Sequence, residues 1–274
     1  MSLTRISLVD FLNARPLTWG LLHDPPEGIF ISRDAPSECA RKLAAGEVDA
    51  GLIPTIEYQR IPGLCVLPGL GIAASSEVRS VLLVSKVSRD QIRSVALDPA
   101  SRTSAVLTRI LLKRVYGLSP DYREADQSAV PSAEASAKAE ASAEADASLI
   151  IGDPALKTRL NGQVVLDLAA EWRAFSGRSF VFAFWAVRGE AASAEVSALL
   201  RRSYETGRAH FDGLVVEEAR RTGLSGPVIE DYLRHALHYE LDAGDLEGLS
   251  LYYRLAAEDG LIDSVRPLTF FGRG

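Results

Sequence analysis

The segment ISLVDFLNARPL, residues 6–17, predicts how the chain folds. It begins as a short apolar run without a helical period, which is typical of a buried parallel strand. The run breaks at Asn13, and Pro16 follows at a position that suits the first turn of a helix. A strand that leads through a loop into a helix brings free backbone N–H groups to the carboxyl end of a sheet, where anions bind. Asn13 and Arg15 are therefore candidate binding residues, and a helix cap is the alternative interpretation of Asn13.

The segments after residue 17 alternate between strand and helix patterns. Short apolar segments lie at 28–31, 49–54 and 64–67, and helical patterns lie at 35–45 and 55–58. The helical segment 35–45 has a proline near its start and a glycine just after its end, as helices commonly do. This alternation is typical of an open parallel sheet.

Two long β-rich segments, VRSVLLVSK (78–86) and FVFAFWAVR (180–188), bracket a second α/β unit. That unit holds a strand at 94–98 and an amphipathic helix at 105–115, which Gly117 closes. The bracketing predicts an α/β protein of two lobes joined by two crossings, with a ligand cleft between the lobes. The expected boundaries are 1–82 and 187–274 for lobe 1 and 83–186 for lobe 2.

The chain from residue 191 onward carries apolar residues at three- and four-residue spacing, which predicts a helical C-terminal region. The predicted helices are 191–211, 215–222, 227–239 and 245–259. Residues 129–147 form a low-complexity stretch of alanine, serine and glutamate that lacks the period of a buried helix or strand. We expect this stretch to be a solvated surface helix or a partly disordered insertion without chemistry.

The composition argues against several classes of protein. The formal charge of -6 disfavours general affinity for nucleic acid, and no apolar run approaches the roughly 18 residues that span a bilayer. The N-terminus shows no secretory signal, and Cys39 and Cys65 are isolated, as reduced thiols are. We therefore expect a cytoplasmic protein that binds neither nucleic acid nor membrane, and the sequence leaves its oligomeric state open.

No metal or cofactor site is predicted. The chain has no Walker A loop, HExxH, CxxC pair, GxSxG or EF-hand motif. Residues 69–74 resemble a GxGxxA dinucleotide fingerprint, but no clear amphipathic helix follows them. His235 and His238 lie three residues apart without an apparent third ligand, so surface histidines are the preferred interpretation.

Polar residues that could carry chemistry lie in turns at the ends of predicted strands. These are Asn13 to Arg15, Pro54 with Thr55, Ser80, Ser101-Arg102-Thr103-Ser104, and Gly152 with Asp153. The three hydroxyls and the guanidinium of the turn 101–104 stand at a helix start, where they can hold a carboxylate or phosphate. A helix cap plus a surface arginine is the alternative interpretation.

A cleft with Asn13 on one lobe and the turn 101–104 on the other suits a small dicarboxylate ligand. The four histidines, His23, His210, His235 and His238, lie outside the residues expected in the cleft. An enzyme with this cleft would therefore lack the commonest general base.

Six segments follow one another in this order: VDFLNARPL, DAGLIPTIEY, VRSVLLVSK, VALDPASRTS, LIIGDPAL and EWRAFSGRSFVFAFWAVR. Through these segments the chain resembles the chorismate dehydratase family of the futalosine route to menaquinone. It covers nearly the whole chain except for 129–147. It implies a two-lobed, periplasmic-binding-protein type II-like fold, no cofactor, and conversion of chorismate into 3-[(1-carboxyvinyl)oxy]benzoate and water.

The resemblance also implies roles for individual residues. Asn13 in FLNARPL and Ser80 in VRSVLL correspond to the family's active-site asparagine and serine, and the turn 101–104 would hold a substrate carboxylate. From the polar turns at the strand ends, and not from the resemblance, we also expect Arg15, Pro54, Thr55, Gly152 and Asp153 to bind substrate. Because no histidine is well placed, our hypothesis is that the enolpyruvyl carboxylate of the substrate itself takes the C3 proton.

Two alternative functions remain open at this point. The first is 1,4-dihydroxy-6-naphthoate synthase, the sister enzyme with the same fold. That enzyme is expected to carry a histidine base in the second lobe, whereas residues 87–179 contain no histidine. The second is a non-catalytic cytosolic protein that binds a small anion.

Overall fold

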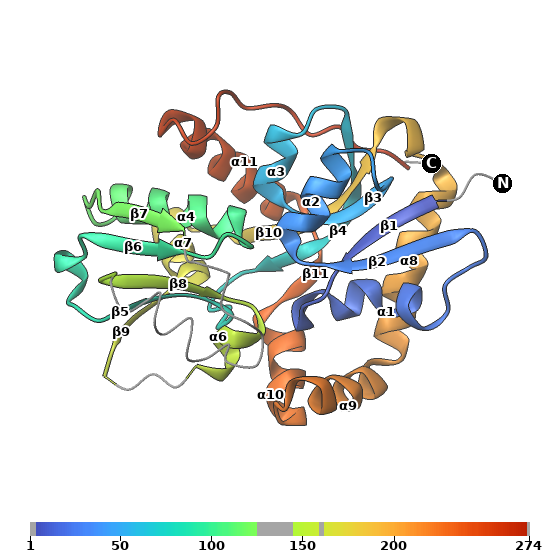
Figure 1. Cartoon of the computed structure of the whole chain (residues 1–274), viewed down its shortest axis with the longest axis horizontal. Coiled ribbons are helices and arrows are strands. Elements are labelled where there is room, and N and C mark those ends of the chain that lie inside the picture. The colour runs from blue at the N-terminus through green and yellow to red at the C-terminus, as the bar shows by residue number, and fades with distance from the viewer. Residues whose placement is uncertain (1–3, 125–144, 159–161, 273–274) are drawn as a thin grey trace.

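A computed structural model describes residues 4–124, 145–158 and 162–272 of the chain. Over these residues the chain forms two lobes, each built on one β-sheet with helices packed around it (Figure 1). The predicted two-lobed α/β fold with a helical C-terminal region is confirmed. Most of the low-complexity stretch 129–147 lies outside the described residues.

The first lobe contains a six-stranded sheet in the order β11-β4-β10-β3-β1-β2. The strand β1 is parallel to β2 and β3, whereas β10 is antiparallel to β3 and β4, and β11 is antiparallel to β4. Their bounds are β1 Thr4–Val9, β2 Ile29–Asp34, β3 Ala50–Pro54, β4 Leu64–Ala74, β10 Phe180–Arg188 and β11 His238–Glu240. The GxGxxA-like residues 69–74 lie inside β4 and therefore do not begin a helix.

The second lobe contains a five-stranded sheet in the order β7-β6-β8-β5-β9. Here β6 is parallel to β7 and β8, and β5 is antiparallel to β8 and β9. Their bounds are β5 Val81–Ser85, β6 Ser94–Leu97, β7 Asp121–Glu124, β8 Ala147–Ile151 and β9 Val164–Asp167. This pairing puts the carboxyl ends of β6 and β8 and the start of β5 at one edge of the sheet.

The two crossings between the lobes lie at 75–80 and 177–179. Residues 180–186, which we expected in lobe 2, belong to β10 and pair within the six-stranded sheet. Residues 81–82, expected in lobe 1, pair with β8 of the five-stranded sheet. The sequence pattern identifies such segments as strands, but their sheet is decided by pairing with strands far away in the chain.

Helices pack around both sheets and form most of the C-terminal region (Figure 1). Their bounds are α1 Arg15–His23, α2 Pro36–Ala44, α3 Thr55–Arg60, α4 Arg102–Arg114, α6 Asp153–Lys157, α7 Leu168–Ser176, α8 Ala194–Ala209, α9 Phe211–Thr222, α10 Gly226–Asp231 and α11 Ala243–Glu258. The short 3-10 helices are η1 Leu12–Ala14, η2 Arg89–Gln91 and η4 Gly189–Ala191.

The predicted helix 227–239 is wrong at its end. After α10 the chain forms a π-helical turn, η5 (Tyr232–Ala236), and residues 238–240 then form the strand β11. The edge of β4 offers backbone hydrogen bonds to this segment, and pairing with β4 overrides the helical period.

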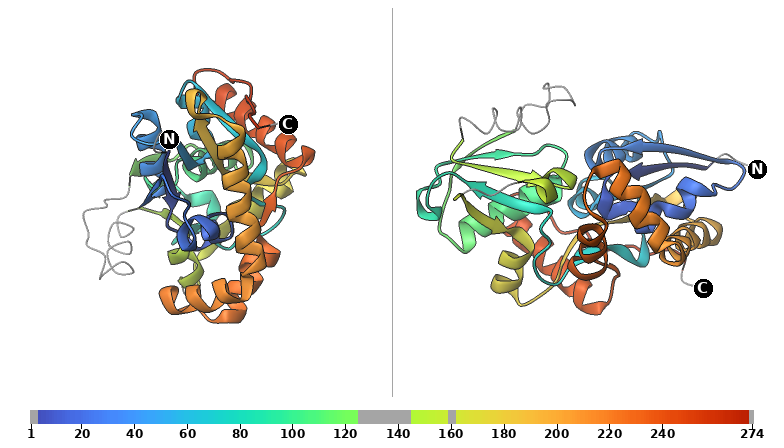
Figure 2. Two further views of the ribbon diagram at one scale, coloured as in Figure 1. Left: turned by 90° about the vertical axis from the view of Figure 1, so that its right-hand side faces the viewer. Right: turned by 90° about the horizontal axis from the view of Figure 1, so that it is seen from below.

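Two glycines let α1 and α8 approach closely. A Cβ at Gly20 would lie 2.7 Å from the Cα of Ser203, and one at Gly207 would collide with the carbonyl oxygen of Pro16. The long α8 therefore holds α1 against the first sheet, with the N-terminus of α1 beside the turn that contains Asn13. Seen from below, the two lobes lie side by side, and α9 and α10 lie in front of their junction (Figure 2).

Candidate active site

A pocket lies between the two lobes, where the polar turns of both sheets meet. It contains about 590 Å³ of empty space, counting the part open to solvent. The predicted site residues on its wall are Asn13, Pro54, Ser80, Ser101, Thr103, Ser104 and Gly152. Apolar side chains from both lobes complete the wall, among them Phe11, Phe182, Leu237 and Ile151.

The strand directions explain why these turns meet. In the first sheet β1 and β3 are parallel, so the turns after them, with Asn13 and Pro54, lie at the same edge. In the second sheet the starts of α4 and α6 follow the parallel strands β6 and β8, and Ser80 precedes the antiparallel β5. Asn13 and Gly152, which are 139 positions apart in sequence, therefore line one pocket.

Asn13 lies in η1, which joins β1 to α1. Its Oδ1 is buried and has no hydrogen-bond partner within the described part of the chain. The N-cap residue of α1 is Ala14, so Asn13 is not the helix cap that we considered as an alternative. Because an unpaired buried polar atom costs about 1–3 kcal/mol, the amide of Asn13 is suited to bind a donor group of a ligand.

Ser80 lies at the end of the first crossing, directly before β5. The hydroxyl of Tyr232 donates a hydrogen bond to Ser80 Oγ over 2.7 Å, and Gly152 N donates to the Ser80 carbonyl over 2.8 Å. Ser80 is 1% exposed. Both its hydroxyl and its backbone are thus held in place at the pocket wall.

The turn 101–104 lies at the start of α4. Ser101 is the N-cap residue of this helix, but its side chain makes no capping hydrogen bond. Ser101, Thr103 and Ser104 all line the pocket, and so the positive end of the helix dipole lies at the pocket as well. This end of α4 is suited to bind an anion.

Arg102 does not lie on the pocket wall as the structure describes it. Its guanidinium is 43% exposed and pairs with Glu57 of α3 over 2.8 Å. Thr103 Oγ1 accepts a hydrogen bond from Ile56 N over 3.2 Å, so two neighbouring residues of α4 attach the second lobe to α3 of the first. Arg102 acts here as an interlobe contact.

Thr55 and Gly152 support the pocket in different ways. Thr55 is fully buried and its hydroxyl donates to the Val181 carbonyl over 3.0 Å, so this hydroxyl is bonded to the strand β10 of the first sheet. Gly152 is on the wall with φ 67°, and a Cβ there would lie 3.4 Å from the ring of Phe11. A glycine therefore suits this turn, because the left-handed backbone and the nearby ring both disfavour a side chain.

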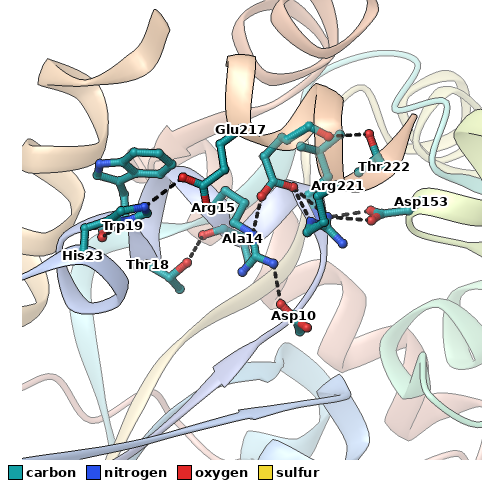
Figure 3. Close-up of polar contacts among 12 residues, drawn as sticks. Asp10, Ala14, Arg15, Thr18, Trp19, His23, Asp153, Glu217, Arg221 and Thr222 are labelled. Carbon is teal, nitrogen blue, oxygen red and sulfur yellow. Dashed lines mark hydrogen bonds and ion pairs between the residues drawn. The ribbon is translucent and has the colours of Figure 1, made fainter. Parts of the chain in front are cut away.

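Arg15 is not on the wall but in a buried ion pair. Its side chain is 3% exposed, its Nε donates to Glu218 of α9 over 2.8 Å, and its Nη2 donates to Asp10 (Figure 3). Two carboxylates thus neutralise the guanidinium that we expected to bind substrate. The ion pair holds α9 against the start of α1.

Asp153 connects the two lobes. Its Oδ1 accepts the N–H of Leu12 over 2.9 Å, and its Oδ2 accepts a hydrogen bond from Arg221 of α9 over 2.8 Å (Figure 3). Arg221 also pairs with Glu218; burial acts to lower the pKa of Arg221, but the two carboxylates raise it overall. Asp153 thus holds the residue next to Asn13 and does not reach the pocket wall.

The described part of the pocket wall is mostly apolar, with a few polar groups and no charge. None of the described residues on its wall carries a charged side chain, and none is a histidine. The described part of the chain also holds no group of three or more histidine, cysteine or acidic residues that could bind a metal ion. An anion in this pocket would be held by hydroxyls, an amide and the start of α4.

Sequence reasoning missed Tyr232, which is buried behind Ser80. Burial raises the pKa of Tyr232 well above its usual value, so the phenol stays neutral and acts as a donor. No local signal distinguishes this tyrosine from others in the helical region, since its partner lies 152 residues away.

Comparison with known proteins identifies relatives of the chain. Residues 4–258 match the family described as menaquinone biosynthesis. The chorismate dehydratase of Thermus thermophilus is 30% identical over 236 residues, which cover 82% of this chain and 86% of that protein. The chorismate dehydratase of Campylobacter jejuni is 28% identical and covers 64% of this chain and 63% of that protein.

Solved structures support the fold. The protein AF1704 from Archaeoglobus fulgidus has a TM-score of 0.75 at 17% identity, covering 94% of this chain and 98% of that one. The periplasmic aliphatic sulphonate binding protein SsuA from Escherichia coli has a TM-score of 0.61 at 18% identity, covering 99% and 94%. Within the described residues, no helix has the length and apolarity that a membrane span requires. The chain therefore belongs to the menaquinone biosynthesis family, in which its named relatives are chorismate dehydratases.

Proposed function

We propose that this protein is a chorismate dehydratase, a hydro-lyase that converts chorismate into 3-[(1-carboxyvinyl)oxy]benzoate and water. Its family and its relatives support this activity. The observation that carries the proposal is the meeting of Asn13, Ser80 and the start of α4 in one uncharged pocket between the lobes. The proposal implies a small-molecule partner and a cytoplasmic location.

The start of α4 is proposed to hold one carboxylate of the substrate. The hydroxyls of Ser101, Thr103 and Ser104 stand there with the first N–H groups of a helix of 13 residues. Because none of the described wall residues is cationic, the second carboxylate of the substrate has no cationic partner among them. A carboxylate without such a partner is a stronger base, which the proposed reaction needs.

The reaction is an elimination that makes a benzene ring. The C3–H bond breaks: its proton goes to the enolpyruvyl carboxylate of the substrate, and its electron pair forms the C3=C4 bond of the benzene ring. The C4–O bond breaks with its electron pair on oxygen, and that oxygen takes the proton from the carboxylate to leave as water. Asn13 and Ser80 orient the carboxylate and the leaving hydroxyl, and the apolar wall excludes bulk water.

A chorismate turnover assay tests the proposal. The purified protein should convert chorismate into an aromatic product that is detected by ultraviolet absorbance. Asn13→Ala and Ser80→Ala should each lower kcat by about 10²–10³-fold, as expected for removal of a group that stabilises the transition state. Ser250→Ala is a matched control, because this exposed hydroxyl of α11 donates to the Leu246 carbonyl of its own helix.

Wild-type turnover in both Asn13→Ala and Ser80→Ala would show that these residues are not the catalytic pair. A wild-type protein that binds chorismate without converting it would instead indicate the small-anion binding protein. The sister enzyme 1,4-dihydroxy-6-naphthoate synthase would likewise leave chorismate unchanged.

A further inference from the structure

The Ser80 hydroxyl contacts a second buried hydroxyl. Tyr232 and Ser80 are both 1% exposed, and their oxygens lie 2.7 Å apart, which is the usual length of an O–H···O hydrogen bond. Within the described residues, Ser80 Oγ has no other side-chain partner. The phenol is therefore the one protein group in this part of the chain that can set the direction of the Ser80 hydroxyl.

Neighbouring contacts hold the two residues together. Arg79 Nη1 pairs with Asp231 Oδ2 over 2.5 Å, so two consecutive residues of the crossing contact two consecutive residues of α10 and η5. Arg79 has φ 61°, a left-handed conformation that non-glycine residues rarely adopt. Asp167 holds this conformation, since its carboxylate accepts Arg79 N over 2.6 Å and also Val78 N.

The direction of the hydrogen bond decides what Ser80 can do. A serine hydroxyl has one hydrogen to donate and two lone pairs to accept with. Because Tyr232 donates to one lone pair, the Ser80 hydrogen remains available for the pocket. Hydrogen bonds in a chain polarise one another, so the phenol also makes Ser80 a stronger donor. Tyr232 begins the π-helical turn η5, and such turns are frequent at functional sites.

We propose that Tyr232 is a positioning residue for the dehydration, which directs the Ser80 hydroxyl as a donor toward the leaving hydroxyl of the substrate. This inference rests on the proposed function. It adds a residue from the C-terminal helical region to the roles that the family resemblance implied.

Tyr232→Phe is the direct test, because it removes one oxygen and keeps the buried ring. We expect kcat to fall about tenfold, as for loss of one neutral hydrogen bond that is used in the transition state, with KM within about twofold of wild type. Tyr239→Phe is the matched control: the Tyr239 hydroxyl is buried in β11 and has no partner within the described residues. Its loss should leave kcat unchanged.

A double-mutant cycle separates positioning from structural support. If Tyr232 acts through Ser80, then Ser80→Ala and Ser80→Ala/Tyr232→Phe should have the same kcat. Full kcat in Tyr232→Phe, or a further tenfold loss in the double variant, would refute the inference while the proposed function stands. A wild-type protein without chorismate turnover would refute the proposed function, and the inference with it.

Discussion

Glu218→Gln tests the buried ion pairs that join α9 to α1. The Glu218 side chain is 1% exposed, and its carboxylate pairs with Arg15 Nε over 2.8 Å and with Arg221. Glutamine keeps the shape but removes the negative charge between two guanidiniums. Removing one partner of a buried pair typically costs about 3–5 kcal/mol. Asp10 and Asp153 still pair with the two arginines in this variant, so we expect it to lose about 3 kcal/mol of unfolding free energy, at the low end of that range.

The expected loss is measured by thermal unfolding followed by circular dichroism. For a protein of this size, about 3 kcal/mol lowers Tm by roughly 5 °C. Glu47→Gln is the matched control, because Glu47 pairs with Arg41 at the same 2.8 Å while both side chains are about half exposed. Solvent screens such a pair, so Glu47→Gln should change Tm by no more than about 1–2 °C. Equal Tm values for the two variants would refute the assignment of stability to the buried pairs.

Two further predictions concern packing and pH. Gly207→Ala should destabilise the protein by about 1–3 kcal/mol in urea unfolding, because the new Cβ collides with the Pro16 carbonyl. In Gly213→Ala, in α9, the new Cβ meets no atom within 4 Å, so this variant should be more stable than wild type by about 0.5–1 kcal/mol. Similar stability of the two variants would contradict the close approach of α1 and α8. Burial acts to raise the pKa of Asp34, but Lys42 and two serine hydroxyls lower it overall. The pKa of Asp34 is lower in the folded than in the unfolded protein, so its ionised form stabilises the fold fully above about pH 5 and loses this effect as the pH falls toward about 3. The difference in unfolding free energy between wild type and Asp34→Asn should therefore become smaller over that range. A gap independent of pH would exclude this role.

Local patterns predicted much of the fold. The buried strand at 6–9, the break at Asn13 and the helix that begins beside Pro16 all appear as expected. The wall of the pocket contains Asn13, Ser80 and three of the four residues of the turn 101–104, because each segment stands at the end of an element and the strand directions bring those ends together. The prediction of a helix up to residue 239 was wrong, because residues 238–240 pair with the strand β4, and no local sequence pattern reveals this pairing.

Charge neutralisation was decided by the tertiary structure. Arg15 looked free in the sequence, but its partner Glu218 lies 203 residues away. Asp153 looked like a ligand-binding residue, but it bonds Leu12 N, which lies 141 residues away. An ion pair leaves no periodic trace in a sequence, so these contacts could not be predicted.

The amino-acid sequence by itself determined most of the order of strands and helices, the two-lobed architecture and the positions of the polar turns. Hydrophobic periodicity, proline and glycine affect the backbone conformation of the nearest few residues, so their effects can be predicted from the sequence. Only the tertiary structure decided which sheet takes β10, which charges are paired and that Tyr232 meets Ser80. These are contacts between distant segments, and they exist only once the segments have packed together.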